Sequence, residues 1–149
     1  TFTIPFNENV TIELDQNKND VFKLVDESLN LNILITDDDA ISEFLLERIV
    51  EKHSAKIFKA HNGLEAIERL HDYPAMDLIL MDLQMPVMNG YEATKHIREI
   101  NKNIIIIAQS AYCLTGDKEK AIEAGCNAFI KKPINSEELY GLLEKYFRK

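Results

Sequence analysis

The chain has 149 residues, of which 46% are hydrophobic and 28% charged, and its formal net charge is −8. This size and apolar content suit one packed domain, and the acidic balance argues against a surface that binds nucleic acid or an anionic membrane. The longest apolar run, residues 104–108, has the length of a strand and falls far short of the roughly 20 residues of a membrane helix.

The first 30 residues differ in composition from the rest of the chain. Residues 1–6 alternate polar and apolar side chains, as a lone strand would. Residues 7–30 contain six acidic residues and two lysines. This composition is typical of a linker, in which the apolar residues near its end could form a short amphipathic helix.

Five short apolar runs alternate with five helical patterns from residue 31 onward. The runs span residues 33–35, 56–60, 78–81, 104–108 and 128–130. Apart from Lys56 and Lys59 in the second run, they are continuously apolar, as expected of strands that are buried on both faces. We therefore predict the α/β class, with a doubly wound parallel sheet and helices on both faces.

The helices are marked by capping residues and by apolar residues at helical spacing. Asn62 and Asn89 are expected to cap helix starts, and Gly125 is expected to end a helix that begins at Thr115. The expected apolar stripes are Ile41, Phe44, Leu45 and Ile49 in the first helix, Leu64, Ile67 and Leu70 buried in the second, and Leu139, Leu142, Leu143, Tyr146 and Phe147 in the last.

The polar residues that follow the apolar runs are the candidates for chemistry, because ligands of an open parallel sheet bind at the carboxyl ends of its strands. These residues are Asp37, Asp38 and Asp39 after the first run, Asp82 after the third, Ser110 after the fourth, and Lys132 with Pro133 after the fifth. Clustered carboxylates repel one another unless a cation lies between them. Oxygen ligands that leave room for water and phosphate suit Mg²⁺.

A phosphoryl group is the ligand that the remaining side chains favour. A lysine and a hydroxyl beside the cation suit an anion with several oxygens, and a neighbouring carboxylate can attack phosphorus to form an acyl phosphate. Each residue alone has a simpler interpretation: Asp39 as a helix cap, Lys132 as a solvated charge, Ser110 as a loop hydroxyl. The agreement of four strand ends favours a phosphoacceptor site, with Asp82 as the acceptor.

On these motifs the chain resembles the receiver domains of response regulators. The motifs are residues 33–38, residues 80–90, Ser110 with Ala111, and Lys132 with Pro133, and the resemblance covers about residues 31–149. It implies a flavodoxin-like (βα)5 fold with strand order 2-1-3-4-5. It also implies that Asp82 is phosphorylated by a phosphohistidine donor.

The resemblance assigns a role to each site residue. Asp38 and Asp82 would hold Mg²⁺ together with the backbone carbonyl of Gln84, and Asp37 would bind it mainly through water. Lys132 would contact the phosphoryl group, across a cis bond to Pro133.

A conformational switch is also implied. Ser110 would swing toward the phosphate and Phe129 would follow it inward, shifting the face of the fourth helix, fifth strand and fifth helix, through which the family often dimerises. Ser110 and Phe129 stand where Thr and Tyr are commoner, and Asn89 where Asp is usual. Gln84 and Tyr112 occupy the positions that tune hydrolysis, and the bulky Tyr112 is expected to shield the acyl phosphate from water.

Residues 1–6 resemble the closing strand of a histidine kinase ATP-binding domain. Followed by a linker (7–30) and a receiver (31–149), they suggest a bacterial hybrid histidine kinase. The fragment has no ATP site of its own and would only promote its own phosphorylation and dephosphorylation. Its partners would be a phosphohistidine domain, of its own or another chain, and a histidine phosphotransfer protein. Cys113 and Cys126 fit reduced thiols of a cytoplasmic domain, whose parent protein could be anchored in the inner membrane.

Three other interpretations remain. The chain could be a free-standing response-regulator receiver. It could be a phosphatase of the haloacid dehalogenase type, since Asp37 and Asp39 form an Asp-x-Asp motif, although Ile41 stands where Thr or Val is expected and the motif at 82–90 would be unexplained. It could also be a binding module that takes no phosphate, but its intact acids, hydroxyl and lysine argue against this.

Overall fold

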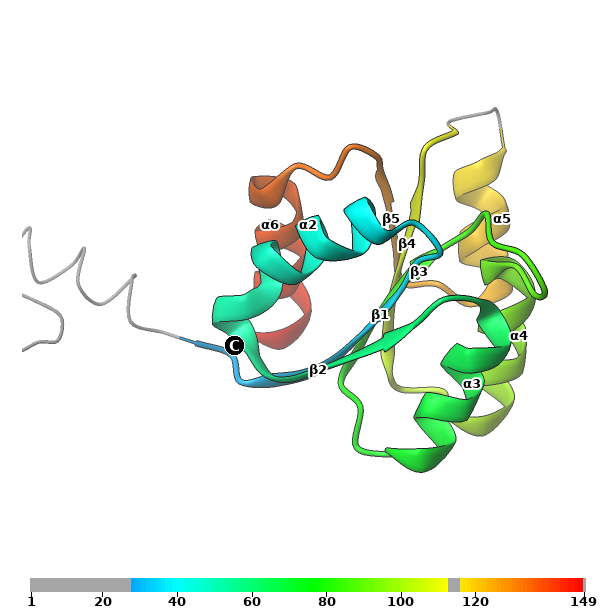
Figure 1. The fold of residues 1–149 in the computed structure, drawn as a ribbon, viewed down its shortest axis with the longest axis horizontal. Helices are drawn as coiled ribbons and strands as arrows, with labels where there is room; N and C mark the ends of the chain where they lie inside the picture. The colour runs from blue at the N-terminus through cyan, green and yellow to red at the C-terminus, as the bar shows by residue number, and fades with distance from the viewer. Residues whose placement is uncertain (1–27, 113–115, 149) are drawn as a thin grey trace, which may run out of the picture.

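The computed structural model describes residues 28–112 and 116–148 as a five-stranded parallel sheet with helices on both sides (Figure 1). The strand order is β2-β1-β3-β4-β5. The strands are β1 (Leu31–Thr36), β2 (Ser54–Ala60), β3 (Leu78–Asp82), β4 (Ile105–Ser110) and β5 (Ala128–Lys131). The predicted class and strand order are confirmed.

Among the described residues, five α-helices and one short 3₁₀ helix lie between or after the strands. The helices are α2 (Ala40–Val50), η1 (Glu51–His53), α3 (Gly63–Asp72), α4 (Gly90–Ile100), α5 (Asp117–Ala124) and α6 (Ser136–Phe147). No helix among the described residues is long and apolar enough to cross a membrane. The strand predicted at 1–6, nearly all of the predicted linker, and Cys113 lie outside the described residues.

Helices cover the sheet on both faces, and the three central strands β1, β3 and β4 are almost entirely buried, whereas the edge strand β2 is partly exposed. Helices α2 and α6 cover one face, and α3, α4 and α5 cover the other (Figure 1). Side chains of a strand alternate between the two faces, so Ile33 and Ile35 join the core cluster with α2 and α6. Leu34 joins the cluster with the other three helices.

Four of the α-helices begin with a side-chain cap, and all four begin beyond the carboxyl end of a strand. A side-chain oxygen of the cap accepts a hydrogen bond from the backbone N–H three residues later. The caps are Asp39, Asn62, Asn89 and Asn135. Helix α5 differs: Gly116, with φ of 93°, precedes it, and its first residue is Asp117, two residues later than predicted.

Helix α3 buries only part of the predicted stripe: Leu70 is buried and Ile67 packs partly buried against the core, but Leu64 does not. Leu64 is 44% exposed, whereas Ala66 and Leu70 are buried. The reason is a close approach at the first turn: the Gly63 N–H donates to the Met88 carbonyl at 2.9 Å. A Cβ on Gly63 would lie 2.7 Å from that oxygen. Only glycine therefore fits at the position of this turn that faces the loop containing Met88, and the next residue, Leu64, points outward.

Helix α2 has apolar residues on two sides, and the sheet contacts only one of them. Leu46 and Val50 are buried against the sheet. Ile41, Phe44 and Leu45, which form most of the predicted stripe, are exposed. Helical spacing identified the helix correctly, but it did not identify the inward side.

Candidate phosphoacceptor site

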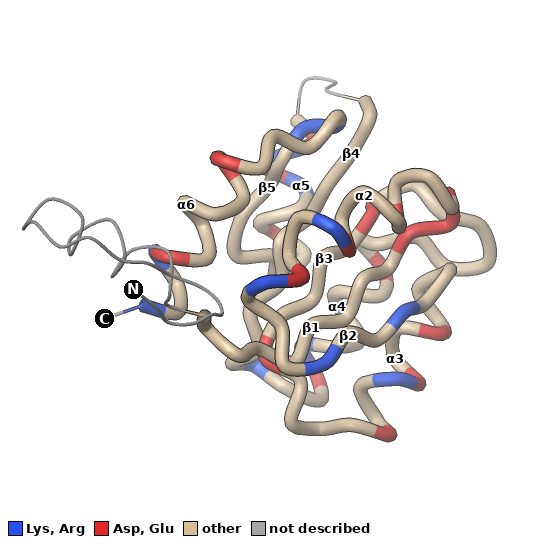
Figure 2. Tube along the Cα trace, turned by 60° about the vertical axis from the view of Figure 1, so that its left-hand side comes forward, with Lys and Arg blue, Asp and Glu red and all other residues tan. Residues whose placement is uncertain are grey.

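Three carboxylates gather where β1 and β3 end. Thr36 pairs with Met81, so the following residues, Asp37 and Asp82, emerge side by side. One carboxylate oxygen from each of Asp37, Asp38 and Asp82 lies within 4.8 Å of the others. The acidic run that supplies two of them follows β1 in Figure 2. Hard oxygen ligands at this separation can share one divalent cation such as Mg²⁺.

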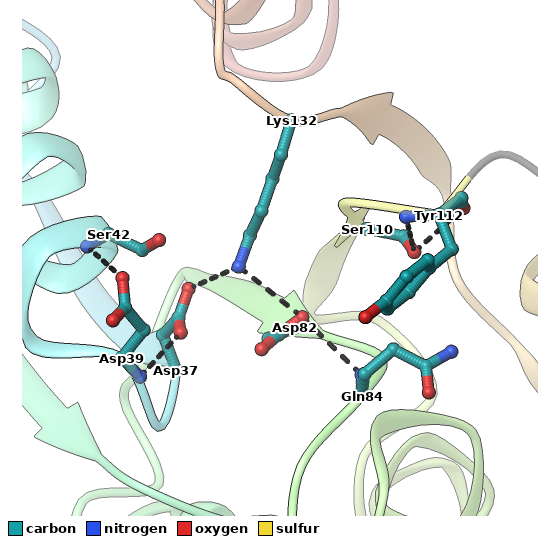
Figure 3. Close-up of polar contacts among 8 residues, drawn as sticks. All are labelled: Asp37, Asp39, Ser42, Asp82, Gln84, Ser110, Tyr112 and Lys132. Carbon is teal, nitrogen blue, oxygen red and sulfur yellow. Dashed lines mark hydrogen bonds and ion pairs between the residues drawn. The ribbon is translucent and has the colours of Figure 1, made fainter.

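Lys132 extends across the sheet to this cluster. It follows β5, and β4 lies between β5 and β3. Its Nζ donates a hydrogen bond to Asp37 Oδ2 at 2.9 Å and lies 3.5 Å from Asp82 Oδ1 (Figure 3). The peptide bond from Lys132 to Pro133 is cis, as the resemblance implied. Lys132 thus provides a positive charge directly beside the candidate acceptor.

The surroundings of Asp82 disfavour its ionised form. Burial, followed by repulsion from Asp37, raises the pKa of Asp82 to about 6, although Lys132 offsets part of this effect. Burial by itself would lower the pKa of Lys132, but its hydrogen bond to Asp37 and the nearby carboxylates raise it instead. Three carboxylates lie beside a single lysine, so their mutual repulsion is only partly offset. A bound cation would reduce the repulsion that remains.

Asp37 and Asp39 have structural partners as well. Asp37 Oδ1 accepts from the Asp39 N–H at 2.9 Å. Asp39 Oδ2 accepts from the Ser42 N–H at 2.9 Å, and this bond lowers the pKa of Asp39. Asp39 is therefore the cap of α2, which was the simpler interpretation of that residue. The cap fixes the turn that presents Asp37 and Asp38.

The loop from β3 to α4 shapes the other side of the site. A Cβ on Gly90 would overlap the backbone carbonyl oxygen of Asp82, so only glycine fits there. The Met88 N–H donates to the Pro86 carbonyl at 2.7 Å across Val87, whose φ is 69°. This is a γ-turn, a conformation that β-branched residues rarely adopt. Gln84 is exposed here, and its N–H donates to Asp82 Oδ1 at 3.4 Å.

Ser110 is buried, but its hydroxyl does not contact Asp82. The Oγ donates to the Tyr112 carbonyl at 2.9 Å and accepts from the Tyr112 N–H at 3.1 Å (Figure 3). The Tyr112 ring is exposed and projects toward the side of the site that holds Asp82 and Gln84. Phe129 is half-buried against the core beneath α3, α4 and α5.

The structure therefore assembles part of the predicted site. Asp37, Asp38, Asp82 and Lys132 are together, whereas the Ser110 hydroxyl is bonded elsewhere and the metal role of the Gln84 carbonyl stays a prediction. Gln109, which is buried in β4 opposite Asp82, was not among the predicted site residues. The signal was present: a polar residue lies between an apolar run and the candidate hydroxyl.

Comparison with known proteins gives a consistent result. The family model described as "Response regulator receiver domain" matches residues 33–144. Together, this doubly wound parallel sheet and its acidic carboxyl edge define a flavodoxin-like receiver fold. The chain belongs to the response regulator receiver domain family.

Similar proteins include both large kinases and a small regulator. The chain is 37% identical over 119 residues to hybrid signal transduction histidine kinase I of Dictyostelium discoideum, covering 74% of the chain but only 7% of that kinase. It is 31% identical over 117 residues to the polar-differentiation response regulator DivK of Brucella anthropi, covering 77% of the chain and 94% of DivK.

A solved relative comes from a complex. The co-crystal structure of the Saccharomyces cerevisiae histidine phosphotransfer signaling protein Ypd1 with the receiver domain of its downstream response regulator Ssk1 contains a chain that matches with a TM-score of 0.73. That chain is 33% identical, and the match covers 79% of this chain and 89% of that one.

Proposed function

We propose that this domain accepts a phosphoryl group from a phosphohistidine onto Asp82, in the presence of Mg²⁺, as the receiver part of a bacterial hybrid histidine kinase. The observation that carries the proposal is the environment of Asp82. It is 3% exposed, shares a 4.8 Å cluster with Asp37 and Asp38, and has Lys132 at 3.5 Å.

The transfer would exchange one bond to phosphorus for another. A carboxylate oxygen of Asp82 attacks phosphorus, and the P–N bond of the donor breaks with its electron pair returning to the imidazole. Lys132 balances charge on the phosphoryl oxygens. Mg²⁺, when bound, would offset charge on the same oxygens. Asp38, Asp82 and the Gln84 carbonyl would hold it, with Asp37 acting mainly through water.

The switch belongs to the same proposal. Ser110 would exchange its bonds to Tyr112 for one to the phosphoryl group, and Phe129 would then move inward. The surface of α5, β5 and α6 would change as a result, and a homodimer could form there. Gln84 and Tyr112 would set the lifetime of the acyl phosphate.

The hybrid origin rests on the relatives and on residues 1–30. The first two curated relatives are hybrid kinases, and the chain spans 5–7% of their length. The parent chain would be a histidine kinase that carries this receiver in the cytoplasm and that could be anchored in the inner membrane. A free-standing receiver is the second candidate, because DivK is matched over 94% of its length.

Exposed apolar residues beside the site suit a protein donor. Ile41, Phe44 and Leu45 lie on α2, which begins directly after the acidic turn. The partner would be a phosphohistidine domain of the same or another chain, or a histidine phosphotransfer protein, the kind of protein that accompanies the Ssk1 receiver in its co-crystal. Burying one phenylalanine side chain at such a contact contributes about 2 kcal/mol.

The phosphoacceptor test uses acetyl phosphate with Mg²⁺ and intact-protein mass spectrometry. We expect one phosphoryl group on the wild type and on Asp72→Asn, a matched exposed acid, and none on Asp82→Asn or after chelation of Mg²⁺. A phosphoryl group on Asp82→Asn, or none on the wild type, would contradict the proposal. Turnover of a phosphate ester that is lost in Asp37→Asn but kept in Asp82→Asn would favour the phosphatase instead.

A separate pair of variants tests whether the exposed apolar residues of α2 contact the phosphohistidine protein. Phe44→Ala should slow transfer from a phosphohistidine protein while leaving the reaction with acetyl phosphate unchanged. Leu64→Ala removes a similarly exposed side chain from α3, on the other side of the sheet, and should affect neither reaction. Equal slowing of both reactions in Phe44→Ala would show that the residue acts on the site itself rather than on the docked partner.

A further inference from the structure

Gln109 lies next to the phosphoacceptor in the sheet. β3 and β4 pair in parallel with Gln109 opposite Asp82, and paired residues project from the same face of a sheet. On its other side Gln109 pairs with Ile130, whose side chain belongs to the core beneath α2 and α6. The Gln109 side chain therefore shares the face of the sheet that carries Asp82.

The side-chain amide nitrogen of Gln109 donates no hydrogen bond to any of the described residues. The side chain is 2% exposed, and its Nε2 is buried without a hydrogen-bond partner among them. A buried polar group without a partner costs about 1–3 kcal/mol. An apolar side chain of similar length would remove that cost, so fold stability gives no reason for an amide here.

The carboxylate of Asp82 is a hydrogen-bond acceptor within reach of the Gln109 amide. Neighbouring strands lie about 4.8 Å apart, which a glutamine side chain can span. The carboxylate of Asp82 is loosely held, since its contacts with the Gln84 N–H and with Lys132 Nζ are 3.4 and 3.5 Å. Typical hydrogen bonds to nitrogen are about 2.9 Å. One more donor would fix the carboxylate in a single orientation.

We infer that Gln109 is a positioning residue for phosphoryl transfer, whose Nε2–H donates a hydrogen bond to the carboxyl group of Asp82 as the group is transferred. This inference rests on the proposed function. Gln109 forms no bond to phosphorus and moves no proton. It holds the attacking oxygen in place, which matters because transfer requires the attacking and leaving atoms to be roughly in line.

The chain provides a matched control in Thr36. Its Oγ1 is also buried without a partner among the described residues. However, Thr36 pairs with Met81, whose side chain belongs to the core on the opposite face of the sheet. Thr36→Val and Gln109→Met each remove one unpartnered buried polar group, and only Gln109→Met does so on the face of Asp82.

The first measurement is the rate of phosphorylation by acetyl phosphate with Mg²⁺, beside the urea midpoint of each variant. We expect both variants to be at least as stable as the wild type. Gln109→Met should react about tenfold more slowly, as expected for one lost hydrogen bond to a charged group, and Thr36→Val at the wild-type rate. If Gln109→Met also reacts at the wild-type rate, the positioning role is wrong.

The second measurement follows the Gln109 side-chain amide of the wild type by ¹⁵N NMR. Adding beryllium fluoride with Mg²⁺, a mimic of the phosphoryl group, should shift both amide proton resonances and slow their exchange with water. Unmoved resonances would overturn the inference even if Gln109→Met fails to fold. A wild type that acquires no phosphoryl group at all would instead count against the proposed function, so the two failures are distinguishable.

Discussion

The two halves of the site differ in how completely they are assembled. In the charged half, Asp37, Asp38 and Asp82 each place a carboxylate oxygen within 4.8 Å of the others, and Lys132 already contacts Asp37 and Asp82. In the hydroxyl half, Ser110 is bonded to the backbone of Tyr112 instead. If Asp82 accepts a phosphoryl group as proposed, the charged half would receive it before any rearrangement. In the proposed switch, the hydroxyl half would respond by exchanging the hydrogen bonds between Ser110 and Tyr112 for one to the phosphoryl group.

The charged half should be the more sensitive to mutation. Lys132→Met removes the only positive charge within bonding distance of Asp82 among the described residues. We expect phosphorylation by acetyl phosphate to slow by about 100-fold, the usual effect of losing one charge-stabilising donor. Lys131→Met, at the exposed neighbouring position, should react normally. A Lys132→Met rate close to that of wild type would mean that charge at this position is unimportant.

The free energy of unfolding should show how unfavourable the ionised Asp82 carboxylate is in the charged half. Folding raises the pKa of Asp82 from 3.8 to about 6, so the folded state binds a proton more tightly than the unfolded state does. Wild-type stability should therefore fall as pH rises from roughly 4 to 6, and Asp82→Asn should escape this loss. At pH 7 without Mg²⁺ the variant should be more stable by an amount on the order of 2 kcal/mol.

Urea unfolding followed by circular dichroism from pH 4 to 8 measures this difference. The gain should shrink toward pH 4, where the wild-type carboxyl is protonated too. Mg²⁺ should also reduce it, because a ligand that binds only the folded state stabilises that state. Glu68→Gln, at an exposed site on α3, controls for simple loss of negative charge. A gain independent of pH would show that ionisation of Asp82 is not its cause.

The hydroxyl half should affect signalling more than stability. Ser110→Ala loses two hydrogen bonds to Tyr112, and we expect unfolding free energy to fall by about 1 kcal/mol. Beryllium fluoride with Mg²⁺ should then no longer shift the ring resonances of Phe129 in NMR spectra. Ser54→Ala loses a comparable bond, to the Glu51 carbonyl at 2.9 Å, and should keep the shift. If the Phe129 resonances still shift in Ser110→Ala, the two residues are not coupled.

The smallest expected effect concerns phosphate lifetime. The exposed Tyr112 ring projects toward Asp82 and Gln84 (Figure 3), where it can limit the access of water. Tyr112→Ala should speed phosphate loss roughly threefold, equivalent to about 0.7 kcal/mol of activation free energy. Tyr112→Phe keeps the ring and should behave like the wild type. If Tyr112→Ala loses phosphate no faster than the wild type, the shielding hypothesis is wrong.

The acidic site was predictable from sequence because its signals are local. A buried strand is followed directly by its polar residues, and parallel strands bring those residues to one edge. Asp37, Asp38, Asp82 and Lys132 follow this rule, and the structure brings them together. The strand order is determined less directly, through the family resemblance, and the structure confirms it.

Tertiary structure decided what each side chain contacts. Helix α2 has apolar residues on two sides, so spacing alone could not show that Leu46 and Val50 would be buried while Phe44 stays 56% exposed. Likewise, a serine hydroxyl can bond to either a backbone or a ligand, and only the folded loop showed that Ser110 bonds to Tyr112.

The sequence by itself determined the order of the elements and the chemistry of the strand ends, because caps, apolar runs and turns act over a few residues. Orientation depends on neighbours that are distant in sequence. The inward position of Gly63 depends on Met88, and the burial of the Gln109 amide depends on packing across three strands. Such contacts form only when the sheet assembles, and they decided which polar groups are held in place and which are free to move.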